Sequence, residues 1–129
     1  MSIEMWSIAV LSFILLAITM VQGGLVPATQ GLRWGLGSRD EPLEKSVMQG
    51  RFARTVQNHA EAMLIYVPLM GLVIALDKTN SFTQIAAWLM IAGRLVFTLF
   101  YLTGTFGLRS AGYAMGLAAI FITAWHLVT

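Results

Sequence analysis

The 129-residue sequence contains no cysteine, and only 11% of its residues are charged. The absence of cysteine excludes a disulfide framework, a thiolate metal site and a cysteine nucleophile. A soluble globular protein has about 25% charged residues. The low charge, together with a hydrophobic content of 57%, therefore indicates a membrane protein. The length is sufficient for one domain.

The N-terminal part of the chain has no lysine or arginine before Arg33. A secretory signal peptide would begin with a basic stretch and end at a small-residue cleavage site. We therefore expect the N-terminal apolar segment to be retained as a transmembrane helix. The basic residues that follow lie in short polar connections or inside apolar segments, so the sequence does not support a nucleic-acid partner.

Four apolar segments are long enough to cross a bilayer, whose hydrocarbon core of about 30 Å needs roughly 20 helical residues. The sequence predicts an all-α membrane protein, a single four-helix transmembrane domain over residues 1–129. Its helices are expected at about residues 5–25, 47–76, 82–102 and 110–127. The connection over residues 26–46 is rich in glycine, proline and charge, and we expect it to form a loop.

Lysine and arginine are distributed unevenly among the connections. Five of them lie in the first connection and the adjoining start of the second helix, whereas the third connection holds Arg109 and the second holds only Lys78. Because cytoplasmic loops of membrane proteins are enriched in basic residues, we expect the first and third connections to be cytoplasmic and both termini to lie outside. The start of the second helix, the end of the third and the start of the fourth then share one membrane face.

A polar run opens the second apolar segment. Arg54, Asn58 and Glu61 are separated by four and then three residues, which places them on one face of a helix. Arg51 belongs to the same run, and Arg94 lies within the third segment, close to mid-membrane. Charged groups at membrane depth are costly, so these residues need partners or a ligand.

A second polar group lies where the third helix ends and the fourth begins, on the same membrane face as the polar run. Its members are Tyr101, Arg109, Ser110 and Tyr113. Arginines suit carboxylates through bidentate hydrogen bonds, and asparagine and glutamate suit an ammonium or an amide. A nearby arginine also stabilises an anion such as a thiolate. A small zwitterion with two carboxylates and one amine would satisfy this set.

The same charges also fit a structural interpretation, in which they clamp the helices together. Arg54 and Glu61 would neutralise each other, or Glu61 would pair with Arg94 across two helices. His59 lies beside the polar face rather than on it. A single histidine without a second ligand at helical spacing does not predict a metal site.

Two blocks of residues resemble the MAPEG family, the membrane-associated proteins in eicosanoid and glutathione metabolism. The first block is Arg51-x-x-Arg54-x-x-x-Asn58-x-x-Glu61, which is similar to the second-helix signature of the family. The second block is Gly93-Arg94 with Tyr101, followed by Arg109-Ser110-x-x-Tyr113, and it is similar to the prostaglandin E synthase branch. The resemblance covers nearly the whole chain, which looks like one of the short bacterial members.

The resemblance implies a homotrimer in the bacterial inner membrane, with glutathione bound as co-substrate between neighbouring subunits. It also implies a detoxifying transferase or peroxidase, in which the glutathione thiolate attacks a hydrophobic electrophile drawn from the lipid bilayer. Arg109 and Ser110 are the catalytic candidates that it implies. The binding candidates are Arg51, Arg54, Asn58, Glu61, Arg94, Tyr101 and Tyr113.

Two positions depart from specialised branches of the family. Phe97 stands where the prostaglandin branch has a polar ring, and Thr105 stands where some members carry a second tyrosine. These residues argue against the isomerase and the leukotriene-synthase chemistries. The alternative function is a non-catalytic MAPEG-like protein whose intramembrane charges form a structural network. A four-helix drug exporter would need an acidic residue deep in the first helix, and Glu4 is expected at the membrane edge.

Overall fold

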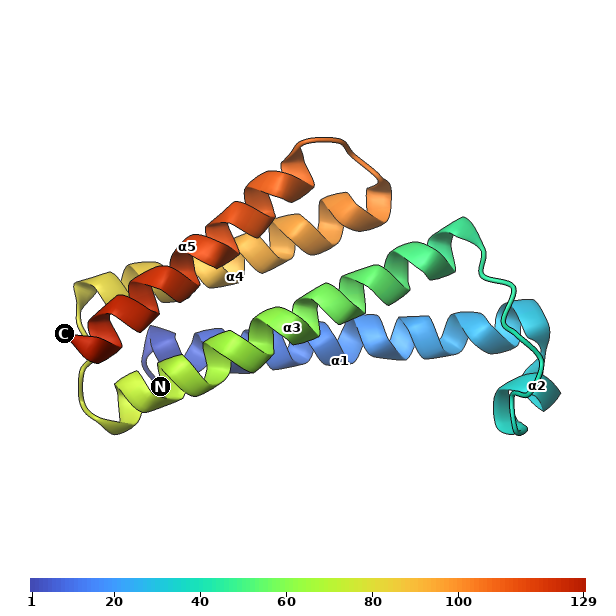
Figure 1. The fold of residues 1–129 in the computed structure, drawn as a ribbon, viewed down its shortest axis with the longest axis horizontal. Coiled ribbons are helices and arrows are strands. Elements are labelled where there is room, and N and C mark those ends of the chain that lie inside the picture. The colour runs from blue at the N-terminus through green and yellow to red at the C-terminus, as the bar shows by residue number, and fades with distance from the viewer.

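The computed structural model describes residues 1–129 as a chain of helices without strands (Figure 1). Its elements are α1 (Ile3–Gln30), α2 (Leu32–Leu36), α3 (Val47–Ala75), α4 (Ser81–Thr103) and α5 (Leu108–Val128). The four long helices have the length and apolar composition of membrane spans. The predicted fold class, an all-α protein with four spans, is confirmed.

The first connection differs from the loop that was predicted over residues 26–46. Helix α1 continues through Pro27 to Gln30, and the short helix α2 follows at once. The prediction was wrong because it averaged glycine and proline over the whole connection, whereas they act at single positions. Gly31 turns the chain with a φ of 83°, a conformation that favours glycine. Apart from Gly31, the irregular backbone of this connection is confined to residues 37–46.

Helices α4 and α5 lie side by side in Figure 1, and their close approach depends on glycine. A Cβ atom at Gly112 would lie 2.5 Å from the backbone nitrogen of Phe97, and one at Gly93 would lie 2.8 Å from the carbonyl oxygen of Gly112. Small residues at membrane helix interfaces allow such backbone contact and the dispersion attraction that comes with it. The pattern Gly112-x-x-x-Gly116 therefore determines how α5 packs on α4.

The hydrophobic core lies where α1, α3, α4 and α5 meet. It consists of Leu11, Tyr66, Met70, Val73, Ala86, Ala87, Met90 and Ala119. Polar contacts accompany the core, since the hydroxyls of Tyr66 and Ser7 lie 2.7 Å apart and Thr83 Oγ1 donates to Glu4 Oε1 at 2.9 Å. Glu4 is the second residue of α1 and is buried against the start of α4.

The two ends of the molecule differ in how closely the helices approach. Both termini and the α3–α4 turn lie at one end, where all four long helices converge (Figure 1). At the other end the α4–α5 pair diverges from α1 and α3, and this end carries α2, the start of α3 and the α4–α5 turn. The three helix ends that were predicted to share one face do share one end of the molecule.

We expect Gly112→Ala to destabilise the protein, because the new methyl group would overlap the α4 backbone at Phe97. Overpacking of this kind costs about 1–3 kcal/mol, and it should lower the midpoint of thermal unfolding in detergent. Gly71→Ala is the matched control, since a Cβ atom there meets nothing within 4 Å. Equal midpoints for the two variants would contradict the close α4–α5 crossing.

Candidate functional site

The start of α3 is fixed by a reciprocal capping interaction one turn before Arg51. Ser46 Oγ accepts a hydrogen bond from the Gln49 backbone at 3.2 Å, and Gln49 Oε1 accepts one from the Ser46 backbone at 2.8 Å. The Gln49 amide also donates to the carbonyl of Leu25 and the hydroxyl of Thr29 on α1. These contacts set the position and direction of the polar face of α3.

Arg54 and Arg109 converge on the ring of Tyr101. Arg54 Nε donates to the Tyr101 hydroxyl at 2.9 Å, and its guanidinium carbon lies 5.9 Å from the ring centroid. The guanidinium of Arg109 at the start of α5 lies 5.3 Å from the same centroid. Three residues that the sequence places far apart thus form one cationic cluster around a phenol, with cation–π attraction from two helices.

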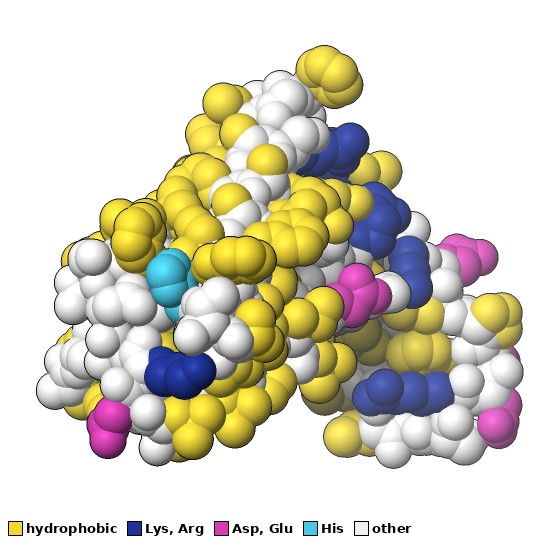
Figure 2. Space-filling model, turned by 60° about the vertical axis from the view of Figure 1, so that its left-hand side comes forward, with side chains coloured by type: hydrophobic (Ala, Val, Ile, Leu, Met, Phe, Trp, Pro, Cys, Tyr) yellow, Lys and Arg dark blue, Asp and Glu magenta, His cyan; other side chains and the backbone are white.

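A polar cavity of about 270 Å³ opens beside this cluster, between α3 and α4. It is lined by Arg54, Gln57, Asn58, Glu61, Phe97 and Tyr101. Gln57 Nε2 donates to Glu61 Oε1 at 3.0 Å and so orients the carboxylate. The predicted polar face of α3 is therefore one wall of a cavity. The space-filling view shows a face on which hydrophobic side chains predominate and basic side chains gather in a short row (Figure 2).

Arg94 reaches the same wall from α4. Its Nη1 donates to Asn58 Oδ1 at 2.9 Å, its guanidinium lies 5.3 Å from the Phe97 centroid, and the residue is only 1% exposed. A Cβ atom at Gly116 would lie 2.6 Å from Arg94 Nη2, so the guanidinium occupies space that a glycine leaves open. These contacts differ from both ion pairs of the clamp interpretation, because Arg94 binds a neutral amide and Glu61 binds Gln57.

A second, smaller cavity of about 140 Å³ adjoins the first. It is lined by Asn58, Glu61, Ala62, Ile65, Arg94, Tyr113, Leu117 and Ile120. Asn58 and Glu61 line both cavities and stand between them. The site therefore has a polar chamber near the end of the bundle, called the outer chamber below. A largely apolar chamber, called the inner chamber, lies farther along α3 and α5.

Three predicted site residues line neither cavity, namely Arg51, Arg109 and Ser110. Arg51 Nη1 donates to the carbonyl of Leu102 at 3.1 Å, and its guanidinium lies against Gly104, which ends α4 with a φ of 76°. Arg51 thus caps the C-terminus of α4, where a cation also interacts favourably with the helix dipole. Ser110 follows Arg109 on α5, and its side chain is exposed.

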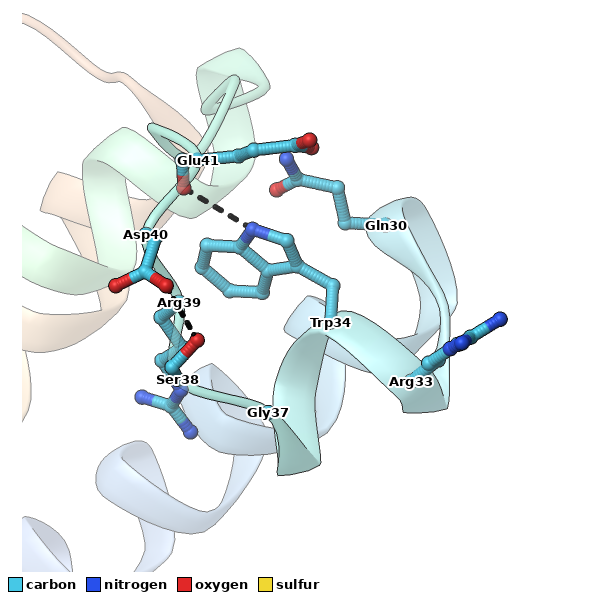
Figure 3. Close-up of a pocket in the computed structure, with 8 residues that line it drawn as sticks. All are labelled: Gln30, Arg33, Trp34, Gly37, Ser38, Arg39, Asp40 and Glu41. Carbon is cyan, nitrogen blue, oxygen red and sulfur yellow. Dashed lines mark hydrogen bonds between the residues drawn. The ribbon is translucent and has the colours of Figure 1, made fainter.

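The largest cavity of the chain, about 460 Å³, lies away from all these residues, around α2 and the irregular connection (Figure 3). Trp34 Nε1 donates to the carbonyl of Glu41 at 3.0 Å, and Ser38 Oγ donates to Asp40 Oδ2 at 2.6 Å. The side chain of Arg33 points away from the indole in Figure 3. None of the predicted site residues lines this cavity.

Two buried groups were not predicted as parts of the packing. His59 Nε2 lies 2.9 Å from the carbonyl oxygen of Leu11, so the imidazole joins α3 to α1. Gly116 provides the space for the Arg94 guanidinium. Because His59 follows Asn58 directly, it lies beside the polar face of α3, and this position was a signal for its contact with α1. The four-residue spacing of Gly112 and Gly116 was a signal for the space beside Arg94.

The fold and the site define a multi-pass integral membrane protein with a charged, two-chambered site lined by three spans. The MAPEG family model matches residues 5–129. The chain belongs to the MAPEG family, and the resemblance seen in the sequence is confirmed. The family includes glutathione transferases and peroxidases as well as non-catalytic members. No curated protein and no solved structure matches the chain.

We expect Arg51→Gln to loosen the end of α4, because the variant loses the charged donor to the Leu102 carbonyl. The loss should cost about 1–2 kcal/mol of unfolding free energy. Hydrogen exchange should accelerate at the amides of Gly104 and Thr105, which close the last turn of α4. Lys45→Gln removes an exposed cation as a control, and unchanged exchange in Arg51→Gln would contradict the capping role.

Proposed function

We propose that the protein is an integral membrane transferase or peroxidase that uses glutathione as co-substrate and acts on hydrophobic electrophiles. The observation that carries the proposal is the pair of adjoining cavities that share Asn58 and Glu61. A polar tripeptide suits the outer chamber, and an apolar reaction partner suits the inner one. Membership of the MAPEG family supports the use of glutathione.

The polar chamber has complementary groups for one carboxylate and for the ammonium of glutathione. The Arg54 guanidinium keeps N–H groups beyond its bond to Tyr101, and these are available to a carboxylate. Glu61 and Asn58 offer oxygen acceptors to the γ-glutamyl ammonium. Tyr101 accepts from Arg54, which leaves its own hydroxyl proton for the ligand. Tyr113 lines the inner chamber and would contact the part of the tripeptide that points inward.

Arg109 is the residue that we assign to thiolate stabilisation. Its guanidinium lies 5.3 Å from the Tyr101 ring centroid, at the edge of the site. A hundredfold shift of the thiol ionisation equilibrium corresponds to about 2.7 kcal/mol. Arg109 is exposed in the single chain, and it would supply this stabilisation once a neighbouring subunit partly desolvates it. The hydroxyl of Ser110, the next residue, would donate to the same sulfur. Arg51 would act indirectly, by holding the end of α4 that carries Tyr101.

We also propose that the site is completed in a homotrimer. Arg54, Gln57 and Glu61 are exposed in the single chain, and charged groups at membrane depth need to be covered. A neighbouring subunit would cover them and close the polar chamber. We also infer from the distribution of lysine and arginine that this end of the molecule faces the cytoplasm of a bacterial cell and that both termini lie outside.

A non-catalytic member with a structural charge network is the second candidate. The bonds from Arg94 to Asn58 and from Arg54 to Tyr101 favour it, because they satisfy polar groups without a ligand. The two candidates differ in one property, the binding of glutathione.

We expect the purified protein to bind glutathione in calorimetric titrations and to generate the ultraviolet absorbance of a thiolate. Glu61→Gln removes one charge-assisted contact and should weaken binding about tenfold, which corresponds to about 1.4 kcal/mol. Arg109→Ala should retain binding but lose the thiolate absorbance and about a hundredfold in conjugation rate. Lys45→Ala, at an exposed lysine of the irregular connection, is the matched charge control.

The absence of binding at millimolar glutathione would contradict the enzyme and favour the structural network. Equal losses of thermal stability in Glu61→Gln and Arg109→Ala, without any effect on ligand binding, would point the same way.

A further inference from the structure

Arg94 is a deeply buried cation without an anionic side chain as its partner. It is 1% exposed, its Nη1 donates to the neutral Asn58, and its guanidinium lies on the ring of Phe97. Its Nε is buried without a hydrogen-bond partner. An unpaired buried N–H group costs stability, and a cation at membrane depth is retained mainly where it has a function.

The surroundings of Arg94 show which kind of molecule it would meet. The guanidinium lines the inner chamber, whose remaining wall is mostly apolar and comes from α3 and α5, through Ala62, Ile65, Leu117 and Ile120. A hydrophobic molecule in this chamber would meet a single cationic hydrogen-bond donor, at one side. Glutathione in the outer chamber would lie beyond Asn58 and Glu61, the residues that both chambers share.

The position of the guanidinium is fixed by the helix crossing. A Cβ atom at Gly116 would lie 2.6 Å from Nη2 and 3.1 Å from Nε, so the α5 backbone passes directly beside the charged group. The Asn58 amide holds it from the α3 side. A donor that is held in advance stabilises a developing negative charge without the cost of reorganisation.

We propose that Arg94 binds the carbonyl oxygen of an α,β-unsaturated ketone or aldehyde whose hydrocarbon part occupies the inner chamber. This inference rests on the proposed function and adds a substrate class to it. Glu61 lines the same chamber, and its carboxylate disfavours a substrate that is already anionic. A neutral carbonyl gains negative charge on oxygen only during the reaction, so Arg94 stabilises the transition state more than the bound substrate.

The reaction is a conjugate addition that needs no oxidant or reductant. The glutathione sulfur forms a bond to the β-carbon, the carbon–carbon double-bond electrons shift toward the carbonyl carbon, and the carbonyl electron pair moves onto oxygen. The resulting enolate oxygen faces the Arg94 guanidinium. The α-carbon then takes a proton, equivalent to the one that the thiol released, and the carbonyl group is restored in a thioether product.

The test compares two electrophiles in the full-length protein, 4-phenyl-3-buten-2-one and benzyl chloride, of which only the first has a carbonyl group. Arg94→Met should lower kcat/KM for the ketone about a hundredfold, as expected for the loss of an oxyanion donor. It should change kcat/KM for benzyl chloride and the affinity for glutathione much less. Arg94→Lys should restore part of the activity toward the ketone.

Thr98→Val is the matched control on α4. Thr98 Oγ1 is also buried without a hydrogen-bond partner, but the residue lines a different groove, with Leu95 and Leu99 among its neighbours. This variant should leave kcat/KM for both electrophiles unchanged. Equal losses for both electrophiles in Arg94→Met would overturn the inference, because they would mark Arg94 as a packing residue.

A measurement on the unaltered protein decides the matter if Arg94→Met does not fold. The saturated ketone 4-phenyl-2-butanone should compete with benzyl chloride about tenfold better than butylbenzene does, because of its hydrogen bond to a charged group. Equal inhibition by the two compounds would overturn the inference. Glutathione binding and benzyl chloride conjugation without ketone turnover would overturn the substrate class alone, whereas the absence of glutathione binding would overturn the proposed function with it.

Discussion

The backbone contact between α4 and α5 is the constraint on which the rest of the structure depends. Membrane helices gain no hydrophobic free energy by leaving lipid for each other, so close packing of small residues holds them together. Gly93 and Gly112 bring the two backbones together, and Gly116 leaves room for the Arg94 guanidinium. Arg94 then reaches Asn58 on α3. One crossing therefore builds the helix pair and also connects it to the polar face of the neighbouring span.

The divergence of the helix pairs at one end follows from where the contacts lie. The core residues and the Tyr66–Ser7 and Thr83–Glu4 contacts hold the helices together toward the end with the termini. At the other end long polar side chains span the gap, with Arg51 bound to the end of α4 and Arg54 bound to Tyr101. The resulting space is polar near the end of the bundle and largely apolar farther along α3 and α5. This arrangement suits the proposed use of a polar thiol and an apolar electrophile.

Much of the architecture could be predicted from the sequence, because it depends on properties that a single chain carries. Apolar length gave the spans, and the alternation of helix directions brought the start of α3, the end of α4 and the start of α5 together. The spacing of Arg54, Asn58 and Glu61 placed them on one wall. These predictions depend on helix geometry, which hardly varies with context.

The partners of the charged groups could not be predicted in the same way. Arg51, Arg54 and Arg94 are chemically alike, and their pairings with a helix end, a phenol and an amide depend on distances that only the packed helices define. Glu61 pairs with Gln57 on its own helix, where an arginine partner had been considered. The connection after α1 was predicted wrongly because local composition does not say at which residue a helix stops. The Gly112-x-x-x-Gly116 pattern is visible in the sequence, but the prediction did not derive a helix contact from it.

The side-chain amide of Gln49 joins the start of α3 to the end of α1, and it uses both of its polar atoms to do so. Its oxygen caps α3 at Ser46, and its nitrogen donates to Leu25 and Thr29 near the end of α1. Deamidation would keep the oxygen acceptor and replace both donors with negative charge. The aged protein would therefore retain the capped start of α3 but lose its hydrogen bonds to Leu25 and Thr29, so that covalent damage at a single nitrogen would detach the start of α3 from the end of α1.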